Sequence, residues 1–311
     1  MSDSIPLPDS EPEAPPSRVL AVLQLVRFAN VFTAMSDIFL GFAMTHGSFE
    51  PTRTFVLLLL SSVCHYWAGM IFNDVFDRDI DARERPLRPI PSGRVSLRFA
   101  VTLGLGLNVT GLVLAGLVGM PSLCVALALT AAIYLYDKVL KKTPLGPVMM
   151  GSCRFFNVLL GASAAPNFGL ESIAPLHVAA GLGLFVCGLT WFAKQEAKWS
   201  NRKLLVGAAL VINTGLAVIL AFLMHAESYG DRTMAMLVLA MITITVLRRL
   251  VAAIFEPSPE HVQVAIKVML LSLVMLDALL VVFTTGDNVL GLITAALLVP
   301  AFVLARWIPM T

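Results

Sequence analysis

Long apolar runs separated by short polar loops make up most of this chain. A helix needs about 20 apolar residues to cross a bilayer, and the sequence holds ten runs of that kind. They cover residues 19–44, 53–72, 99–120, 121–137, 145–165, 174–193, 204–225, 232–250, 262–284 and 288–307. Only Gly119, Met120 and Pro121 separate the third run from the fourth, so nine helices is the alternative. The pattern predicts an all-α, polytopic transmembrane bundle of nine or ten helices.

Composition agrees with a membrane protein. Of the 311 residues, 58% are hydrophobic and 14% are charged. Continuous apolar runs exclude a water-soluble enzyme, and they also exclude a β-barrel, whose strands alternate apolar and polar residues. A net charge of +2 is too small to indicate nucleic acid as a partner. The four cysteines, Cys64, Cys124, Cys153 and Cys187, lie in or beside apolar runs and are interpreted as packing residues.

Basic residues concentrate in alternate loops, which predicts the orientation of the bundle. They occupy 78–98, 138–142, 194–203 and 248–249. By the positive-inside rule these loops and the N-terminus are cytoplasmic, and the expected location is a bacterial cytoplasmic membrane. Residues 1–17 are acidic and rich in proline, so we expect a disordered tail without a cleaved signal, followed by one membrane domain over 18–311.

Oxygen-bearing side chains follow the second apolar run without an intervening loop. If the helix continues, a rotation of about 100° per residue places four of them on one face. This acidic stripe consists of Asn73, Asp74, Asp77 and Asp81, whereas Asp79 points away. Carboxylates crowded in a low-dielectric site repel one another unless cations lie between them, and all-oxygen ligands favour Mg²⁺. The alternative is a solvated helix end held by salt bridges to the arginines of 78–98.

The run N-D-x-x-D-x-x-x-D resembles the first aspartate-rich motif of the UbiA superfamily of intramembrane prenyltransferases. The resemblance implies that Asn73, Asp74, Asp77 and Asp81 bind Mg²⁺, which bridges to the diphosphate of an isoprenoid donor. The next stretch, R-P-x-R-P-I-P-S-G, is also similar to the loop after that motif. Its Arg85 and Arg88 either contact phosphate or anchor the loop at the membrane surface.

Two later segments extend the resemblance. Tyr134 and Lys138 form Y-x-x-x-K on one helix face and resemble a family motif that binds the diphosphate, although both residue types also anchor helices at interfaces. The second aspartate-rich motif is replaced by F-A-K-Q-E-A-K, where Glu196 is the single acid and Lys194 lies nearby. The resemblance implies Glu196 as a metal ligand and Lys194 as a substrate contact. This segment is similar to the EboC-type branch of the superfamily.

Polar residues inside two apolar runs are further candidates for the substrate pocket. Arg27 and Asn30 share a predicted face of the first helix, and Arg154 and Asn157 share one of the fifth. Arginine in lipid is costly and therefore lines a cavity or pairs internally. Pairing with a carboxylate of the bundle is the alternative. No partner for Asp37 or Asp277 can be named from the sequence.

The predicted function is Mg²⁺-dependent transfer of an isoprenyl group from a prenyl diphosphate to an aromatic or other lipid-soluble acceptor within the bilayer. Metal and cationic side chains would neutralise the leaving diphosphate, with Asp74, Asp77, Lys138 and Glu196 as catalytic residues. The alternative is a catalytically lapsed UbiA-like protein that binds or moves an isoprenoid or aromatic metabolite. The D-G-x-x-A-R pattern of CDP-alcohol phosphatidyltransferases is missing, which argues against that class.

Overall fold

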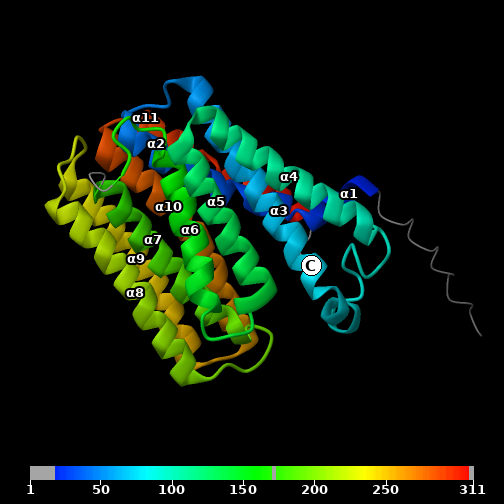
Figure 1. The fold of residues 1–311 in the computed structure, drawn as a ribbon. Coiled ribbons are helices and arrows are strands. Elements are labelled where there is room, and N and C mark those ends of the chain that lie inside the picture. Colours follow the sequence, from blue (N-terminus) through cyan, green and yellow to red (C-terminus); the bar gives the residue numbers. More distant parts are fainter. Residues whose placement is uncertain (1–17, 170–172, 308–311) are drawn as a thin grey trace, which may run out of the picture.

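The computed structural model describes residues 18–169 and 173–307, and in this part of the chain every regular element is helical. The helices pack side by side as a bundle (Figure 1). They are α1 (Arg18–Leu25), α2 (Val31–His46), α3 (Thr52–Glu84), α4 (Leu97–Val118), α5 (Met120–Leu135), α6 (Gly146–Ala162), α7 (Ile173–Phe192), α8 (Arg202–His225), α9 (Arg232–Phe255), α10 (Pro259–Thr285), α11 (Asn288–Ala296) and α12 (Leu298–Trp307). The predicted tail, 1–17, lies outside the described residues.

Eight helical segments of the described chain are long and apolar enough to cross a membrane. The predicted segments 145–165 and 288–307 correspond to shorter helices. The first is α6, with 17 residues, and the second is the apolar stretch Asn288–Leu304 of α11 and α12. The predicted division of the third and fourth segments is confirmed, because α4 ends at Val118 and α5 begins at Met120.

The first predicted helix is interrupted at Arg27. Arg27 has a left-handed backbone, with φ 47° and ψ 54°, and a short 3₁₀ turn (Phe28–Asn30) joins it to α2. The prediction that Arg27 and Asn30 share a face of one continuous helix is therefore wrong. A left-handed conformation is costly for a residue with a Cβ and persists only where surrounding contacts hold it. Those contacts belong to the candidate site described below.

Apolar side chains fill two main regions of the bundle. The larger joins α7, α8, α9 and α10, and the smaller joins α2, α3 and α5. Glycine brings α2 and α6 unusually close, since a Cβ added at Gly41 would lie 2.1 Å from the carbonyl oxygen of Val158. Small residues of this kind let membrane helices approach closely.

Polar loops gather at one end of the bundle, where α3 ends. This basic end comprises the loops 85–96, 141–145 and 196–201 (lower part of Figure 1). Helix α3 has 33 residues, which corresponds to about 50 Å and exceeds the hydrocarbon thickness of a bilayer. Arg94 in the first loop donates to Gln24 Oε1 on α1 at 2.8 Å, and Lys194 donates to the carbonyl oxygen of Thr143 at 2.9 Å. These contacts connect separate parts of the chain around the end of α3.

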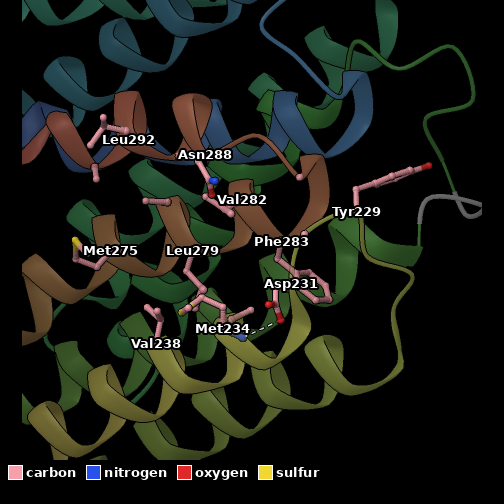
Figure 2. A pocket seen from close by; sticks show the side chains of 16 residues that line it. Tyr229, Asp231, Met234, Val238, Met275, Leu279, Val282, Phe283, Asn288 and Leu292 are labelled. Atoms are coloured by element: carbon pink, nitrogen blue, oxygen red, sulfur yellow. Dashed lines mark hydrogen bonds between the residues drawn. The ribbon is translucent and has the colours of Figure 1, made fainter.

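A pocket of about 460 Å³ lies between α9, α10 and α11, toward the opposite end of α10 (Figure 2). Met234, Val238 and Leu279 are among its largely apolar lining residues. Its carboxylate, Asp231, accepts hydrogen bonds from the backbone N–H groups of Thr233 and Met234 and so caps α9. The described residues that line this pocket include no Lys or Arg, so it lacks the cationic groups that recognition of a diphosphate requires.

Candidate functional site

The acidic stripe lies on one face of α3, as the sequence predicts. The helix continues without a break to Glu84. The side chains of Asp74, Asp81 and Asp77 are 6%, 7% and 14% exposed, whereas Asp79 is 83% exposed. If these acids were ordinary surface residues, all four side chains would be similarly exposed to solvent. The helical-face prediction is confirmed, and Asp79 lies outside the cluster.

Three cationic side chains from different segments contact the stripe. Arg27 Nη2 and Arg88 Nη1 each lie 3.3 Å from Asp74 Oδ1, and Arg88 Nη1 also lies 2.7 Å from Asp81 Oδ2. Lys141 pairs with Asp77. The residue with the left-handed backbone, Arg27, therefore places its guanidinium against the stripe.

The two candidate arginines of the loop after α3 occupy different environments. Arg88 is buried between Asp74 and Asp81, whereas Arg85 is exposed. The charge of Arg85 nevertheless acts on Glu196. The structure thus brings Arg88 into the acidic stripe and places Arg85 at its margin.

Asp137 is a site residue that the sequence analysis missed. It is 8% exposed, and its Oδ1 accepts a hydrogen bond from Asn73 Nδ2 at 2.8 Å. On the other side of the same amide, Arg27 Nη2 lies 3.4 Å from Asn73 Oδ1. The available signal was an acid inside the Y-x-x-x-K segment, between Tyr134 and Lys138, at the end of an apolar run.

The segment after α5 is wound as a π-helical turn over Tyr136–Leu140, closed by a 2.8 Å hydrogen bond from Lys141 N to the Tyr136 carbonyl oxygen. This winding changes the register on which the Tyr134–Lys138 argument depended. Tyr134 packs against Phe72, with ring centroids 4.9 Å apart, while Lys138 is exposed. Lys141 is the lysine that reaches the stripe. A π turn inside a helix is frequently found at functional sites.

Glu196 and Lys194 lie at the margin of this cluster. Burial raises the pKa of the half-buried Glu196 carboxyl above its ordinary value, and the nearby charge of Arg85 opposes that rise. The Lys194 ammonium donates a hydrogen bond to the carbonyl oxygen of Thr143. In the part of the chain that the structure describes, neither side chain forms a hydrogen bond or ion pair with the stripe carboxylates.

Arg154 and Asn157 belong to a separate, fully buried network. Arg154 lies 2.6 Å from Asp37 Oδ1 and 2.8 Å from Asp277 Oδ2. Asn157 Nδ2 donates to Asp37 Oδ2 at 2.7 Å, and its Oδ1 accepts from Ser62 at 2.7 Å. These contacts support pairing within the bundle and supply partners for both aspartates. The side chain of the remaining candidate, Asn30, lies close enough to Tyr66 to interact with its phenol group.

Metal binding can be judged from the donor set. Among residues 18–169 and 173–307, no three Asp, Glu, His or Cys side chains converge to hold one ion. The stripe carboxylates instead contact Arg88 and Lys141. Mg²⁺ is usually held by one or two carboxylates, with waters and substrate phosphates completing its shell. The carboxylates of Asp74, Asp77, Asp81 and Asp137 outnumber the contacting cations Arg27, Arg88 and Lys141. Oxygen donors and excess negative charge fit Mg²⁺.

Comparison with known families gives a match over residues 34–310 to the UbiA prenyltransferase family. This chain belongs to the UbiA prenyltransferase family. It is accordingly a multi-pass integral membrane protein, in agreement with its apolar helices.

Among the curated relatives of this UbiA-family protein are archaeal digeranylgeranylglyceryl phosphate synthases. The enzyme of Methanopyrus kandleri is 35% identical over 159 residues, which cover 50% of this chain and 58% of the relative. That of Metallosphaera sedula is 38% identical over 122 residues, covering 39% and 43%. The chain spans about half the length of the curated relatives it matches.

Solved structures share the fold over nearly the whole chain. One, a structure concerned with digeranylgeranylglyceryl phosphate synthase in membranes, has a TM-score of 0.66 at 20% identity; the match covers 87% of this chain and 99% of that chain. A UbiA homologue from Aeropyrum pernix K1 has a TM-score of 0.65 at 17% identity, covering 86% and 96%. A homologue from Archaeoglobus fulgidus, bound to GPP and Mg²⁺, has a TM-score of 0.58 at 14% identity, covering 89% and 99%.

Proposed function

We propose that this UbiA-family protein transfers an isoprenyl group from a prenyl diphosphate to a lipid-soluble acceptor, with Mg²⁺ as cofactor. The observation that carries the proposal is the acidic stripe with its three cations at the end of a membrane helix. Asp77, Lys141 and Arg27 are only partly buried, so a ligand can reach them. The cluster therefore offers carboxylates for a metal cation and cationic side chains for a diphosphate, and both are accessible to a ligand.

The residues of the cluster divide into two roles in this proposal. Asn73, Asp74, Asp77 and Asp81 hold Mg²⁺, which when bound neutralises charge on the departing diphosphate and favours ionisation of the allylic C–O bond. Lys141, Arg88 and Arg27 supply donors for phosphate oxygens. We assign Lys141 the role that the sequence suggested for Lys138, because only Lys141 contacts the stripe.

The other predicted site residues keep narrower proposed roles. Glu196 and Arg85 are close enough to interact electrostatically, which supports a second, outer position for metal or phosphate on that side. Lys194, at the same loop, would contact a phosphate only after leaving the Thr143 carbonyl. Asn30 and Tyr134 remain proposed lining residues of the substrate cavity, whereas the contacts of Arg154 and Asn157 favour a structural role.

The names of the relatives bear on the substrates. Because several curated relatives are digeranylgeranylglyceryl phosphate synthases, we propose a geranylgeranyl-type donor and an isoprenoid glyceryl phosphate as the first acceptor to test. The similarity of 192–198 to the EboC-type branch, together with an aromatic acceptor, is the second proposal. The basic loops support a cytoplasmic location of the site and of the N-terminus. We propose a bacterial cytoplasmic membrane as its location.

A non-catalytic role is the competing function, and one observation favours it. The segment 192–198 has Glu196 as its single acid where the family pattern supplies several aspartates. Under this alternative the same cluster binds an isoprenoid diphosphate without turnover.

The test uses purified protein in lipid nanodiscs with Mg²⁺, labelled prenyl diphosphates of several lengths, and either an isoprenoid glyceryl phosphate or a lipid extract as acceptor. Asp77→Asn is the inactive control. A labelled product that depends on Asp77 supports the prenyltransferase. Saturable binding without product or pyrophosphate release across the whole panel would favour the non-catalytic role.

A further inference from the structure

We propose that Asp137 is a positioning residue that fixes the side-chain amide of Asn73 with its oxygen toward Asp74 and the proposed metal. The inference rests on the proposed function, because it concerns the same site. Asp137 acts through Asn73 rather than by touching substrate.

The orientation follows from hydrogen-bond chemistry. A primary amide has a donor end and an acceptor end, and a metal can be bound only by the oxygen. An ionised carboxylate only accepts hydrogen bonds, so Asp137 requires Nδ2 of Asn73 to face it; the distance is 2.8 Å. A guanidinium only donates, so Arg27, at 3.4 Å, requires Oδ1 on its own side. The two neighbours demand the same orientation.

Burial makes this constraint effective. Asn73 is 7% exposed and Asp137 is 8% exposed, so water does not offer the amide a ready substitute partner. Leaving a buried donor without a partner is costly. With Asp137 removed, only the longer 3.4 Å contact with Arg27 still favours this orientation. The amide can then flip more easily, and the flipped form would present N–H groups to a cation.

The backbone of the Asp137 segment is matched to α3 in register. Asn73 and Asp77 are four residues apart on α3, and their partners Asp137 and Lys141 are also four residues apart. The π-helical turn at Tyr136–Leu140 contains Asp137 and ends one residue before Lys141. One segment therefore contacts the stripe twice, with an acid opposite the amide and a base opposite the acid.

The experiment measures Mn²⁺ binding by electron paramagnetic resonance in nanodiscs with pyrophosphate present, and so does not depend on turnover. Asp137→Ala is expected to weaken Mn²⁺ binding by about tenfold or more, the range found when outer partners of ligands are removed. Asp137→Asn retains a carbonyl acceptor and should recover part of the affinity. Asp79→Ala, at the exposed acid of the same helix, is the matched control and should bind as the unmodified protein does.

A double variant separates positioning from direct ligation. In an Asn73→Ala background, Asp137→Ala should cause little additional loss, because there is no amide left to orient. A full additional tenfold loss would show that Asp137 acts independently of Asn73 and would overturn the proposal. Unchanged binding in Asp137→Ala, or no Mn²⁺ binding by the unmodified protein, would overturn it as well.

The same preparations separate this inference from the proposed activity. If the unmodified protein binds Mn²⁺ with the predicted dependence on Asp137 but forms no product from any donor, the positioning role stands and the transferase proposal fails. Should Asp137→Ala not fold, as judged by size-exclusion chromatography, the comparison of Asp137→Asn with Asn73→Ala decides the matter, since equal affinities in all folded variants contradict the proposal.

Discussion

Two clusters in this protein pair arginine with buried aspartate, yet their surroundings differ. In the acidic stripe, Asp77 is 14% exposed and its partner Lys141 is 28% exposed. In the Arg154 network, Arg154 is 8% exposed and Asp37 and Asp277 are at most 1% exposed. The first cluster is assembled from loops and helix ends, and the second from the interiors of α2, α6 and α10.

The comparison teaches that charge alone does not identify a ligand site in a membrane protein. In the Arg154 network, the guanidinium also donates to the Thr33 carbonyl, and Ser36 donates to Asp277. Such buried ion pairs connect helices, and exchanging partners there would leave a charge unpaired in a low-dielectric interior. The stripe has partly exposed members, and together with Asp137 it brings four acids against the three bases Arg27, Arg88 and Lys141. Its partners can therefore change when a ligand arrives.

The largest expected effect separates residues within the stripe helix. Asp74→Asn and Asp77→Asn should each reduce prenyl transfer by on the order of 100-fold or more, because each removes a carboxylate proposed to hold the Mg²⁺ that neutralises the leaving diphosphate. Asp79→Asn should be nearly silent, since its side chain points away. Initial rates of product formation on folded protein provide the measurement. Equal losses at Asp79 and Asp77 would contradict the assignment of the stripe face.

The next effect concerns stability. Arg154→Leu leaves Asp37 and Asp277 without their guanidinium, and removing one partner of a buried pair costs about 3–5 kcal/mol. The variant should therefore unfold at markedly lower temperature in detergent. Protein that remains folded should retain its affinity for pyrophosphate. A loss of that affinity without a loss of stability would instead support a role for Arg154 in binding substrate.

A smaller effect tests which lysine serves the site. Lys141→Ala should raise the KM for the prenyl diphosphate by about tenfold, the loss expected for one charge-assisted contact of about 1.4 kcal/mol. Lys138→Ala, three residues earlier in the same turn and exposed, is the matched control and should leave KM nearly unchanged. The reverse result would support the original Y-x-x-x-K interpretation.

The smallest effect is a pH dependence at the margin of the stripe. Burial raises the pKa of Glu196 above its ordinary value of 4.5. The folded state therefore favours the protonated carboxyl, and Glu196 makes folding less favourable as pH rises from about 4.5 through the raised pKa. Glu196→Gln should flatten this part of the stability profile, measured as Tm between pH 4 and 7. A steeper decline in the variant would contradict the sign of the shift.

Catalysis gives a second expectation for Glu196. If Glu196 holds a second metal, Glu196→Gln should lower the rate of prenyl transfer substantially at saturating donor. An unchanged rate at neutral pH would indicate that metal binding is confined to the stripe, where no contact of Glu196 is observed.

Much of the fold could be predicted because hydrophobic runs report membrane helices directly. The same periodicity placed Asn73, Asp74, Asp77 and Asp81 on one face, and the continuous α3 confirms it. The break at Arg27 could not be predicted, since arginine has no intrinsic preference for a left-handed backbone and tertiary contacts hold it there.

The site was incomplete in the sequence analysis for two physical reasons. The i, i+4 argument for Tyr134 and Lys138 assumed α-helical winding, and the π turn at Tyr136–Leu140 places Lys141 against Asp77. The contact between Asn73 and Asp137 joins residues 64 positions apart, which no local pattern predicts. The partners of Asp37 and Asp277 are likewise distant in the sequence, so no local pattern predicts them.

The most direct test of the account is thermal stability in nanodiscs, measured with and without Mg²⁺ and pyrophosphate, for the unmodified protein, Asp77→Asn and Arg154→Leu. A ligand that binds the folded state raises its Tm. The account predicts that Asp77→Asn keeps its basal Tm and loses the ligand-induced rise, while Arg154→Leu has a lower basal Tm and keeps the rise. The opposite pattern, with the rise abolished by Arg154→Leu and preserved in Asp77→Asn, would contradict the assignment of the acidic stripe as the ligand site.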